Sequence, residues 1–220
     1  ISLVIPAGVI TGVLPVSGIL SIIIFIVVSP TLGLISAYLL GMVIIRLFRN
    51  ANSKWMNVIF SKLQVFSAAF YSIGHGSNDA QNAMGVITAL LVAAGILSEF
   101  IVPAWVIIIS GLAIALGTFL GGWRVVETMG KKITKLRPYQ GFCAETGGGV
   151  VLSFVTAFGV PVSTTHAISG SIMGVGATRG YSAVQWGIVR RIVAAWVLTI
   201  PLTATCSFAA FLAYRAIVGI

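Results

Sequence analysis

The chain has 220 residues, of which 58% are hydrophobic and only 8% are charged, and its mean hydropathy is +1.09. Soluble globular domains carry about 25% charged residues, so this composition excludes an ordinary soluble domain and predicts a surface that faces mostly lipid. The net charge of +9 does not indicate a nucleic-acid partner. The basic residues cluster between apolar runs, as the positive-inside rule expects of cytoplasmic loops.

Several apolar runs are long enough to form helices in a hydrocarbon core about 30 Å thick. The first two can also form one long broken helix. The sequence therefore predicts an all-α polytopic membrane protein in the lipid bilayer. In chain order the runs are Ile19–Val28, Leu32–Ile45, Val102–Leu120 and Val193–Ile217.

Basic residues predict the topology. The positive-inside rule places three basic segments on the cytoplasmic side of the cell inner (plasma) membrane. Between the first two segments we expect spans over about Leu63–Ala94 and Ala104–Gly121, joined outside the cell near Glu99. A final helix from about Ile192 would put the C-terminus outside. The basic segments are Arg46–Lys62, Arg124–Arg137 and Arg179–Arg191.

A polar motif, Gly74–Gly85, lies inside the first of these two spans. Its glycines and its Ser-Asn-Asp run weaken a helix, so we expect an interrupted helix whose second half begins near Asn78. Asp79 and Asn82 are three residues apart and share a helix face. A carboxylate, amides and freed carbonyls suit Na⁺ or another hard cation. The alternative is that Asp79 pairs with His75, or caps a helix, for structural reasons only.

The stretch Tyr139–Thr178 begins and ends on the predicted cytoplasmic side. Its second arm, Val162–Ala177, is too short to span the membrane, and Pro161 breaks the chain between the arms. We expect a re-entrant hairpin that turns near Gly159. Irregular backbone at membrane depth is tolerated only where protein buries it or where it lines a wet cavity, so the hairpin tip is a candidate site.

The second arm opens with hydroxyl residues after a proline, which is typical of a helix N-terminus. Exposed amides at such an end bind anions, and the side chains of Ser163, Thr164 and Thr165 can add donors to a tetrahedral oxyanion. The alternative is ordinary capping of a structural hairpin.

Two ionisable residues of the hairpin have more than one interpretation. His166 is either a buried, hydrogen-bonded histidine or a proton-coupling group. Glu145 is a cation ligand, a proton carrier, or a partner of Lys135 or Arg137.

An internal repeat is also expected. Val16–Leu40 and Gly187–Phe211 are both apolar helices with a proline at the same place. Transporters are often built from inverted repeats. We interpret residues 1–50 as the tail of a first repeat and residues 51–220 as a second one, with the missing N-terminal repeat of the same protein as partner.

Two motifs carry a family resemblance. Gly76–Ala83 matches a Gly-x-Asn-Asp-x-x-Asn-Ala pattern, and Pro161–His166 reads Pro-Val-Ser-Thr-Thr-His. Over about Ser53–Ile220 the sequence resembles the inorganic phosphate transporter (PiT) family, bacterial type. The resemblance implies an inverted-repeat transporter with broken helices and re-entrant hairpins, with phosphate near the midplane. It implies cation and phosphate-site roles for Asn78, Asp79 and Asn82, and makes Ser163, Thr164 and Thr165 phosphate ligands.

The sequence therefore predicts a secondary active transporter of inorganic phosphate coupled to Na⁺ or H⁺, without a cofactor, by alternating access. A sulfate permease of the same architecture is the nearest alternative. An intramembrane hydrolase is disfavoured, since no nucleophile elbow or HExxH motif is present. A scaffold subunit would not need polar residues in its membrane segments. A homo-oligomer stays open.

Overall fold

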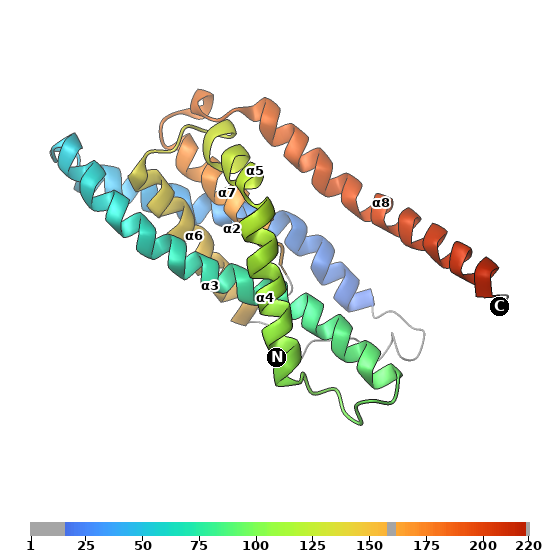
Figure 1. The fold of residues 1–220 in the computed structure, drawn as a ribbon. Helices are drawn as coiled ribbons and strands as arrows, with labels where there is room; N and C mark the ends of the chain where they lie inside the picture. The colour runs from blue at the N-terminus through green and yellow to red at the C-terminus, as the bar shows by residue number, and fades with distance from the viewer. Residues whose placement is uncertain (1–15, 158–161, 219–220) are drawn as a thin grey trace. The chain divides into compact units, whose positions relative to one another are not determined.

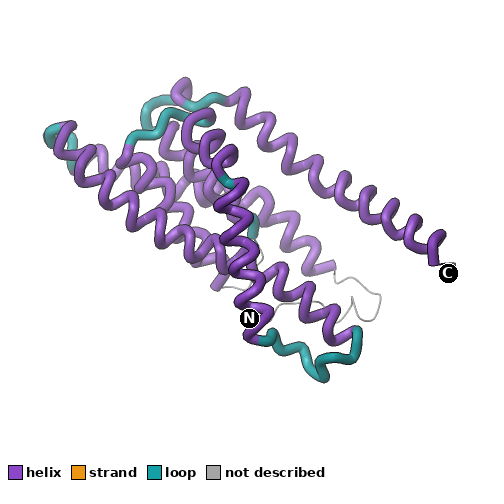
Figure 2. Tube along the Cα trace, viewed as in Figure 1, coloured by secondary structure: helices purple, strands orange, loops and turns teal. Residues whose placement is uncertain are grey.

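A computed structural model describes residues 16–157 and 162–218 (Figure 1). Within these residues the chain is helical and has no strand (Figure 2), which confirms the all-α prediction. A single π-helical turn follows α5 over Thr128–Lys132, and a 3₁₀ turn spans Tyr181–Ala183. The α-helices are α2 (Val16–Leu47), α3 (Ser53–Ala93), α4 (Ala104–Gly121), α5 (Trp123–Glu127), α6 (Pro138–Ala157), α7 (Thr164–Ala177) and α8 (Trp186–Val218).

The chain divides into two compact units, Ile1–Val184 and Gln185–Ile220. In the first unit α6 and α7 pack against each other, and α2 packs on both of them. The α3 helix packs on both α6 and α4. The second unit consists of α8, which begins a few residues before the predicted start at Ile192.

The α6–α7 pair has the antiparallel arrangement expected of the predicted hairpin. Gln140, near the start of α6, donates from Nε2 to the carbonyl oxygen of Val175, near the end of α7, at 3.2 Å. Both outer ends of the pair therefore lie at the same end of the first unit (Figure 1). The predicted turn at Gly159 and Pro161 lies outside the described residues.

The predicted interruption of the helix near Asn78 is wrong. The α3 helix runs without a break from Ser53 to Ala93. The side chains of Asn78 and Asp79 bond to the α6–α7 hairpin, not to their own backbone, so they do not compete with the helix. Each helical glycine costs only about 1 kcal/mol, which is less than the cost of exposing unpaired backbone groups to hydrocarbon.

Prolines also leave their helices continuous. The α2 helix passes through Pro30, so the first two apolar runs form one helix, and α8 passes through Pro201. Three described helical segments are long and apolar enough to cross a membrane: Ile23–Leu47, Ala104–Gly121 and Trp186–Ile217.

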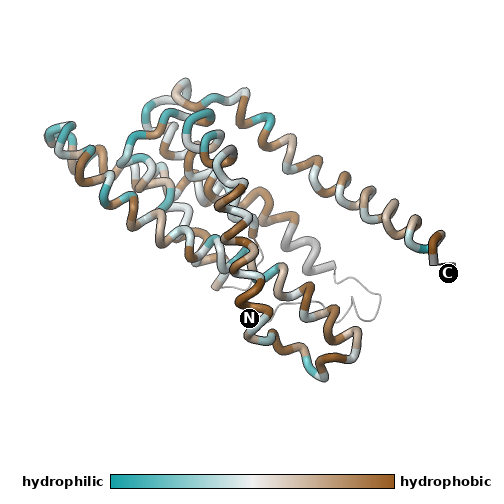
Figure 3. Tube along the Cα trace, in the orientation of Figure 1, coloured by the Kyte–Doolittle hydropathy of each residue, from teal (hydrophilic) through white to brown (hydrophobic). Residues whose placement is uncertain are grey.

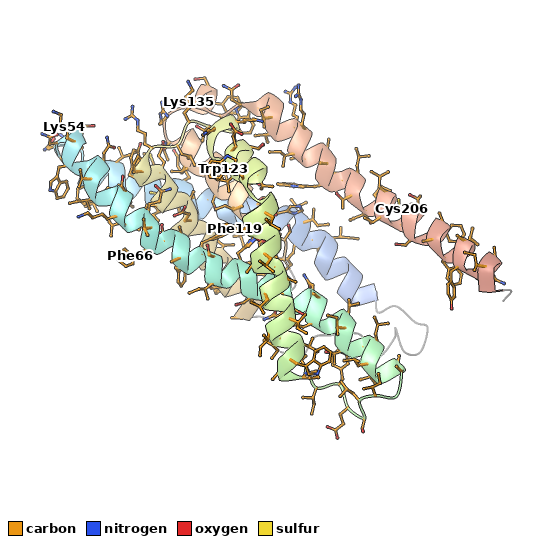
Figure 4. All side chains as sticks on the ribbon, viewed as in Figure 1. Lys54, Phe66, Phe119, Trp123, Lys135 and Cys206 are labelled. Atoms are coloured by element: carbon orange, nitrogen blue, oxygen red, sulfur yellow. The ribbon has the colours of Figure 1, made fainter. Side chains whose placement is uncertain are left out.

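The α4 bounds agree with the predicted span Ala104–Gly121. The predicted span in α3 is long enough, but α3 is not among the three segments chosen by length and composition. Polar positions interrupt the hydrophobic ones along it (Figure 3). Large apolar side chains on α3 and α4 still point outward, such as Phe66 at 75% and Phe119 at 86% exposure (Figure 4). Such surfaces are typical of lipid contact.

Residues of the three basic segments that belong to the first unit lie at one end of that unit. Arg179 donates from Nη1 to the carbonyl oxygen of Lys135 at 3.1 Å. The ring of Phe60 lies 5.8 Å from that of Phe48 and 6.4 Å from that of Tyr139, between centroids. These contacts join the α2–α3 link to the start of α6.

The hairpin approaches α2 very closely. A Cβ added to Gly170 would overlap the backbone of Pro30, and one added to Gly174 would overlap the backbone of Leu34. Small residues at such spacing let membrane helices pack backbone to backbone. This contact holds α7, and the polar residues at its start, firmly against α2.

Candidate functional site

The two polar motifs meet where the middle of α3 passes the start of α7. Asn78 donates from Nδ2 to the carbonyl oxygen of Val162 at 3.0 Å. Thr164 donates from Oγ1 to Oδ1 of Asp79 at 3.3 Å. Residues that are 85 positions apart in the sequence thus lie side by side.

Ser163 caps α7, as predicted. Its backbone is extended (φ −77°, ψ 116°), and its side chain accepts a hydrogen bond from the backbone N–H of His166 at 3.4 Å. The helix then begins at Thr164. The first N–H groups of an α-helix have no carbonyl partner within the helix, and together they carry a partial positive charge. An anion is therefore favoured at this end of α7.

Two ring-bearing residues of α3, His75 and Tyr71, lie beside Asp79 and the start of α7. The Oδ2 atom of Asp79 lies 3.4 Å from Nε2 of His75. The pairing of these two residues, which the sequence analysis gave as the structural alternative, is therefore present. Tyr71 stacks on His75 with ring centroids 5.8 Å apart and donates from its hydroxyl to the carbonyl oxygen of Thr164 at 3.0 Å. The side chain of Asp79 is still 40% exposed, which leaves it accessible to an ion.

Some predicted residues lie away from this meeting point. Asn82, one turn further along α3, is exposed and makes no side-chain hydrogen bond among the described residues. Thr165 is half-buried, and its carbonyl oxygen accepts a hydrogen bond from Ser169 at 2.6 Å. Ser163 lies at the meeting point, between Val162 and Thr164, and is exposed. Among the described residues no hydrogen bond fixes the side chains of Asn82 and Thr165.

Glu145 forms a separate polar cluster. Its carboxylate accepts a hydrogen bond from Oγ of Ser67 at 2.5 Å and lies 3.5 Å from Nε2 of Gln64. Ser67 precedes Asp79 by about 18 Å along the α3 axis. Within the described part of the chain Glu145 makes no ion pair with Lys135 or Arg137.

His166 is buried, with 9% exposure, and its side chain hydrogen-bonds the backbone of Ile26 in α2. It therefore lies in the contact between α7 and α2.

The sequence interpretation named Asn78 and His75 but missed Gln64, Ser67 and Tyr71, the other α3 residues that complete the two clusters. Polar residues recur along one face of α3 at steps of three or four, the helical spacing, and this stripe was the available signal. The stripe consists of Gln64, Ser67, Tyr71, His75 and Asn78.

The donor groups around Asp79 are mostly oxygen atoms, which are hard ligands. Within residues 16–157 and 162–218 no group of three or more His, Cys, Asp or Glu side chains could hold a metal ion. The groups present are one carboxylate, hydroxyls, an amide and backbone carbonyls, which suit Na⁺ better than a transition metal.

The fold defines a polytopic helical membrane protein with polar contacts between its helices. The sequence model of the phosphate transporter family matches residues 2–207. The chain belongs to that family, as its motifs predicted.

Relatives agree with this assignment. A probable low-affinity inorganic phosphate transporter of Rhizobium meliloti is 54% identical over 190 residues, which cover 84% of this chain and 57% of the relative. One from Bacillus subtilis is 38% identical, over 88% of this chain and 59% of the relative. A solved structure described as the sodium-dependent phosphate transporter matches with a TM-score of 0.67 and 30% identity, over 79% of this chain and 45% of that one. The chain thus spans less than two thirds of the relatives it matches.

Proposed function

We propose that this chain is part of a secondary active transporter that carries inorganic phosphate together with Na⁺ or H⁺ by alternating access. The relatives named above are described as probable low-affinity inorganic phosphate transporters, and the structural relative is described as the sodium-dependent phosphate transporter, which favours Na⁺. No finding supports the sulfate alternative. Because the relatives are transporters, a catalytic activity is not proposed.

The observation that carries the proposal is the 3.3 Å contact between Asp79 and Thr164. It brings an acid to the end of α7 that favours an anion. A phosphate bound 6 Å from this carboxylate would be repelled by about 3 kcal/mol per unit charge at an effective dielectric constant of 20. A cation beside Asp79, or a proton on it, removes that repulsion. Phosphate and cation then strengthen each other's binding by the same factor.

Ligand roles follow from this arrangement. Ser163, Thr164 and Thr165 donate hydroxyl or amide hydrogen bonds to phosphate, and Asp79 holds the cation. Asn82 supplies an amide to either solute from the exposed face of α3. Asn78 is committed to Val162, so its main contribution is to hold α3 against the hairpin beside the bound phosphate.

Coupling is assigned to Asp79 first and to Glu145 second. Glu145 of α6 forms a polar cluster with Ser67 of α3, the helix that carries Asp79, and can take up a cation or proton along the route. We assign His166 a structural role, the interpretation that its bond to Ile26 favours, and keep proton coupling as the alternative to be tested.

The proposed architecture has two inverted repeats, with residues 51–220 as one of them. Pro30 lies near the middle of the 32-residue α2, and Pro201 near the middle of the 33-residue α8, which supports their equivalence in a repeat. The complete site then includes a second Asn-Asp helix and a second hairpin from the rest of the protein. We propose that the protein lies in the inner membrane. The basic end of the first unit then faces the cytoplasm, and the C-terminus lies outside.

The test uses the full-length protein in proteoliposomes with labelled phosphate. Wild-type uptake should depend on an inward Na⁺ gradient or, if H⁺ is the coupling ion, on a pH gradient in choline buffer. Asp79→Asn should abolish this cation dependence, while Glu99→Gln, the loss of an exposed acid in the α3–α4 link, should leave it unchanged. Cation-dependent uptake by Asp79→Asn at the wild-type rate would refute the role of Asp79. Full inhibition of uptake by sulfate at equal concentration would favour the sulfate permease.

A further inference from the structure

A pocket of about 190 Å³ opens at the end of the first unit where the basic segments meet. It lies between the end of α2, the start of α3 and the start of α6, far along α3 from Asp79. It is lined by Ile44, Ile45, Phe48, Arg49, Ser53, Met56, Asn57, Arg137 and Tyr139.

One part of the lining is positively charged and rich in donors. Arg49 and Arg137 are exposed, and within the described residues neither side chain forms an ion pair or a hydrogen bond. No acid lines the pocket. Ser53 is the first residue of the 41-residue α3, where the helix dipole adds positive potential. Two guanidiniums that share a cavity without a carboxylate are ready to bind an anion with planar or tetrahedral oxygens.

The rest of the lining is apolar. Ile44 of α2, Phe48 directly after α2 and Met56 of α3 contribute to the wall, and the Phe48 ring contacts the rings of Trp55 and Phe60. A free inorganic anion gains nothing from such a wall. A lipid needs both parts, because its phosphate is followed at once by glycerol and acyl carbons.

We propose that this pocket binds the phosphodiester headgroup of an anionic membrane lipid. Arg49 and Arg137 contact the phosphate, Tyr139 can donate a hydrogen bond from its phenol, and the first apolar part of the lipid lies against Phe48. Basic pockets between membrane helices at the cytoplasmic surface are suited to such headgroups. The bound lipid links the α2–α3 turn to the start of the hairpin, and this binding does not depend on the transport cycle proposed above.

The experiment titrates the detergent-solubilised full-length protein with phosphatidylglycerol or phosphatidylcholine and resolves the bound lipid by native mass spectrometry. The wild type should prefer phosphatidylglycerol. Each of Arg49→Gln and Arg137→Gln should weaken its binding about fivefold, the factor that corresponds to about 1 kcal/mol per basic residue at an anionic surface. Met56→Phe, which adds bulk to the apolar wall and keeps both arginines, should weaken it as well.

The matched control is Arg46→Gln with Lys62→Gln, which removes two exposed charges of the same basic region that do not line the pocket. The proposal requires that this control keeps the preference for phosphatidylglycerol. An equal loss in the control would show that general surface charge holds the lipid, which overturns the proposal. Displacement of the lipid by millimolar inorganic phosphate would also overturn it, since the pocket would then be a site for the free ion. Retained preference in both arginine variants would overturn it directly.

Discussion

Asn78 in the middle of α3 donates a hydrogen bond to the carbonyl oxygen of Val162, the residue just before the α7 cap, at 3.0 Å. Val162 is 9% exposed and packs in the small core that contains Leu152 and Val155 of α6. The bond therefore connects three elements at one point: α3, α6 and the segment that leads into α7. It sets the position of α3 relative to Ser163 and Thr164.

This bond predicts that Asn78→Ala destabilises the protein. The substitution leaves the buried Val162 carbonyl without its donor, which costs about 1–3 kcal/mol. Thermal unfolding of the full-length protein in detergent should show a lower midpoint. Asn82→Ala is the matched control, because Asn82 is exposed and makes no side-chain hydrogen bond among the described residues, and its midpoint should stay at the wild-type value. Equal midpoints for the two variants would mean that the bond does not stabilise the hairpin.

The second prediction concerns the charge of Glu145. Glu145→Gln keeps the shape of the side chain and a carbonyl oxygen that accepts a hydrogen bond from the hydroxyl of Ser67. Glutamine does not bind and release a proton, and it has no negative charge to attract a cation. Phosphate uptake in proteoliposomes should fall at least tenfold, while the unfolding midpoint changes little. Glu99→Gln provides the control for a lost acid. If Glu145→Gln transports at the wild-type rate, Glu145 is a structural hydrogen-bond acceptor only.

Much of the helix pattern was predictable from local physics. The bounds of α4 follow from an uninterrupted apolar run, and the start of α7 follows from Ser163, whose hydroxyl can accept a backbone N–H where the chain leaves an extended conformation. The antiparallel α6–α7 pair follows from the shortness of its second arm. These features depend on residues near in sequence, which is why composition and spacing were sufficient.

The course of α3 was not predictable in the same way. Glycines and a Ser-Asn-Asp run indicate a break only if their side chains turn back on their own backbone. In the fold Asn78 and Asp79 bond instead to residues more than 80 positions away, so the helix keeps its backbone bonds. The same long-range packing defines the Glu145 cluster, since its partner Ser67 lies on another helix. The sequence alone does not show which residues of different helices will bond to each other.

His166 gives a prediction about pH. Gln at this position retains a donor for the backbone of Ile26 but does not titrate, so a purely structural histidine predicts an unchanged pH profile of phosphate uptake in His166→Gln. His166→Phe removes the donor and should lower the unfolding midpoint, which serves as the measure of the structural role. A pH profile that flattens or shifts in His166→Gln, with the midpoint preserved, would assign proton coupling to this residue instead.

The last prediction tests the close contact of α7 with α2. A methyl group on Gly170 or Gly174 would overlap the backbone of Pro30 or Leu34, and backbone cannot move aside as a flexible side chain does. Gly170→Ala and Gly174→Ala should each destabilise the full-length protein by about 3 kcal/mol, at the upper end of the usual cost of overpacking. Gly111→Ala in α4 is the control, because its Cβ would meet no atom within 4 Å, and the gain in helix propensity should keep or raise its stability by up to about 1 kcal/mol. Unfolding midpoints in detergent compare the three variants. A midpoint for Gly170→Ala as high as that for Gly111→Ala would show that α2 and α7 do not pack backbone to backbone.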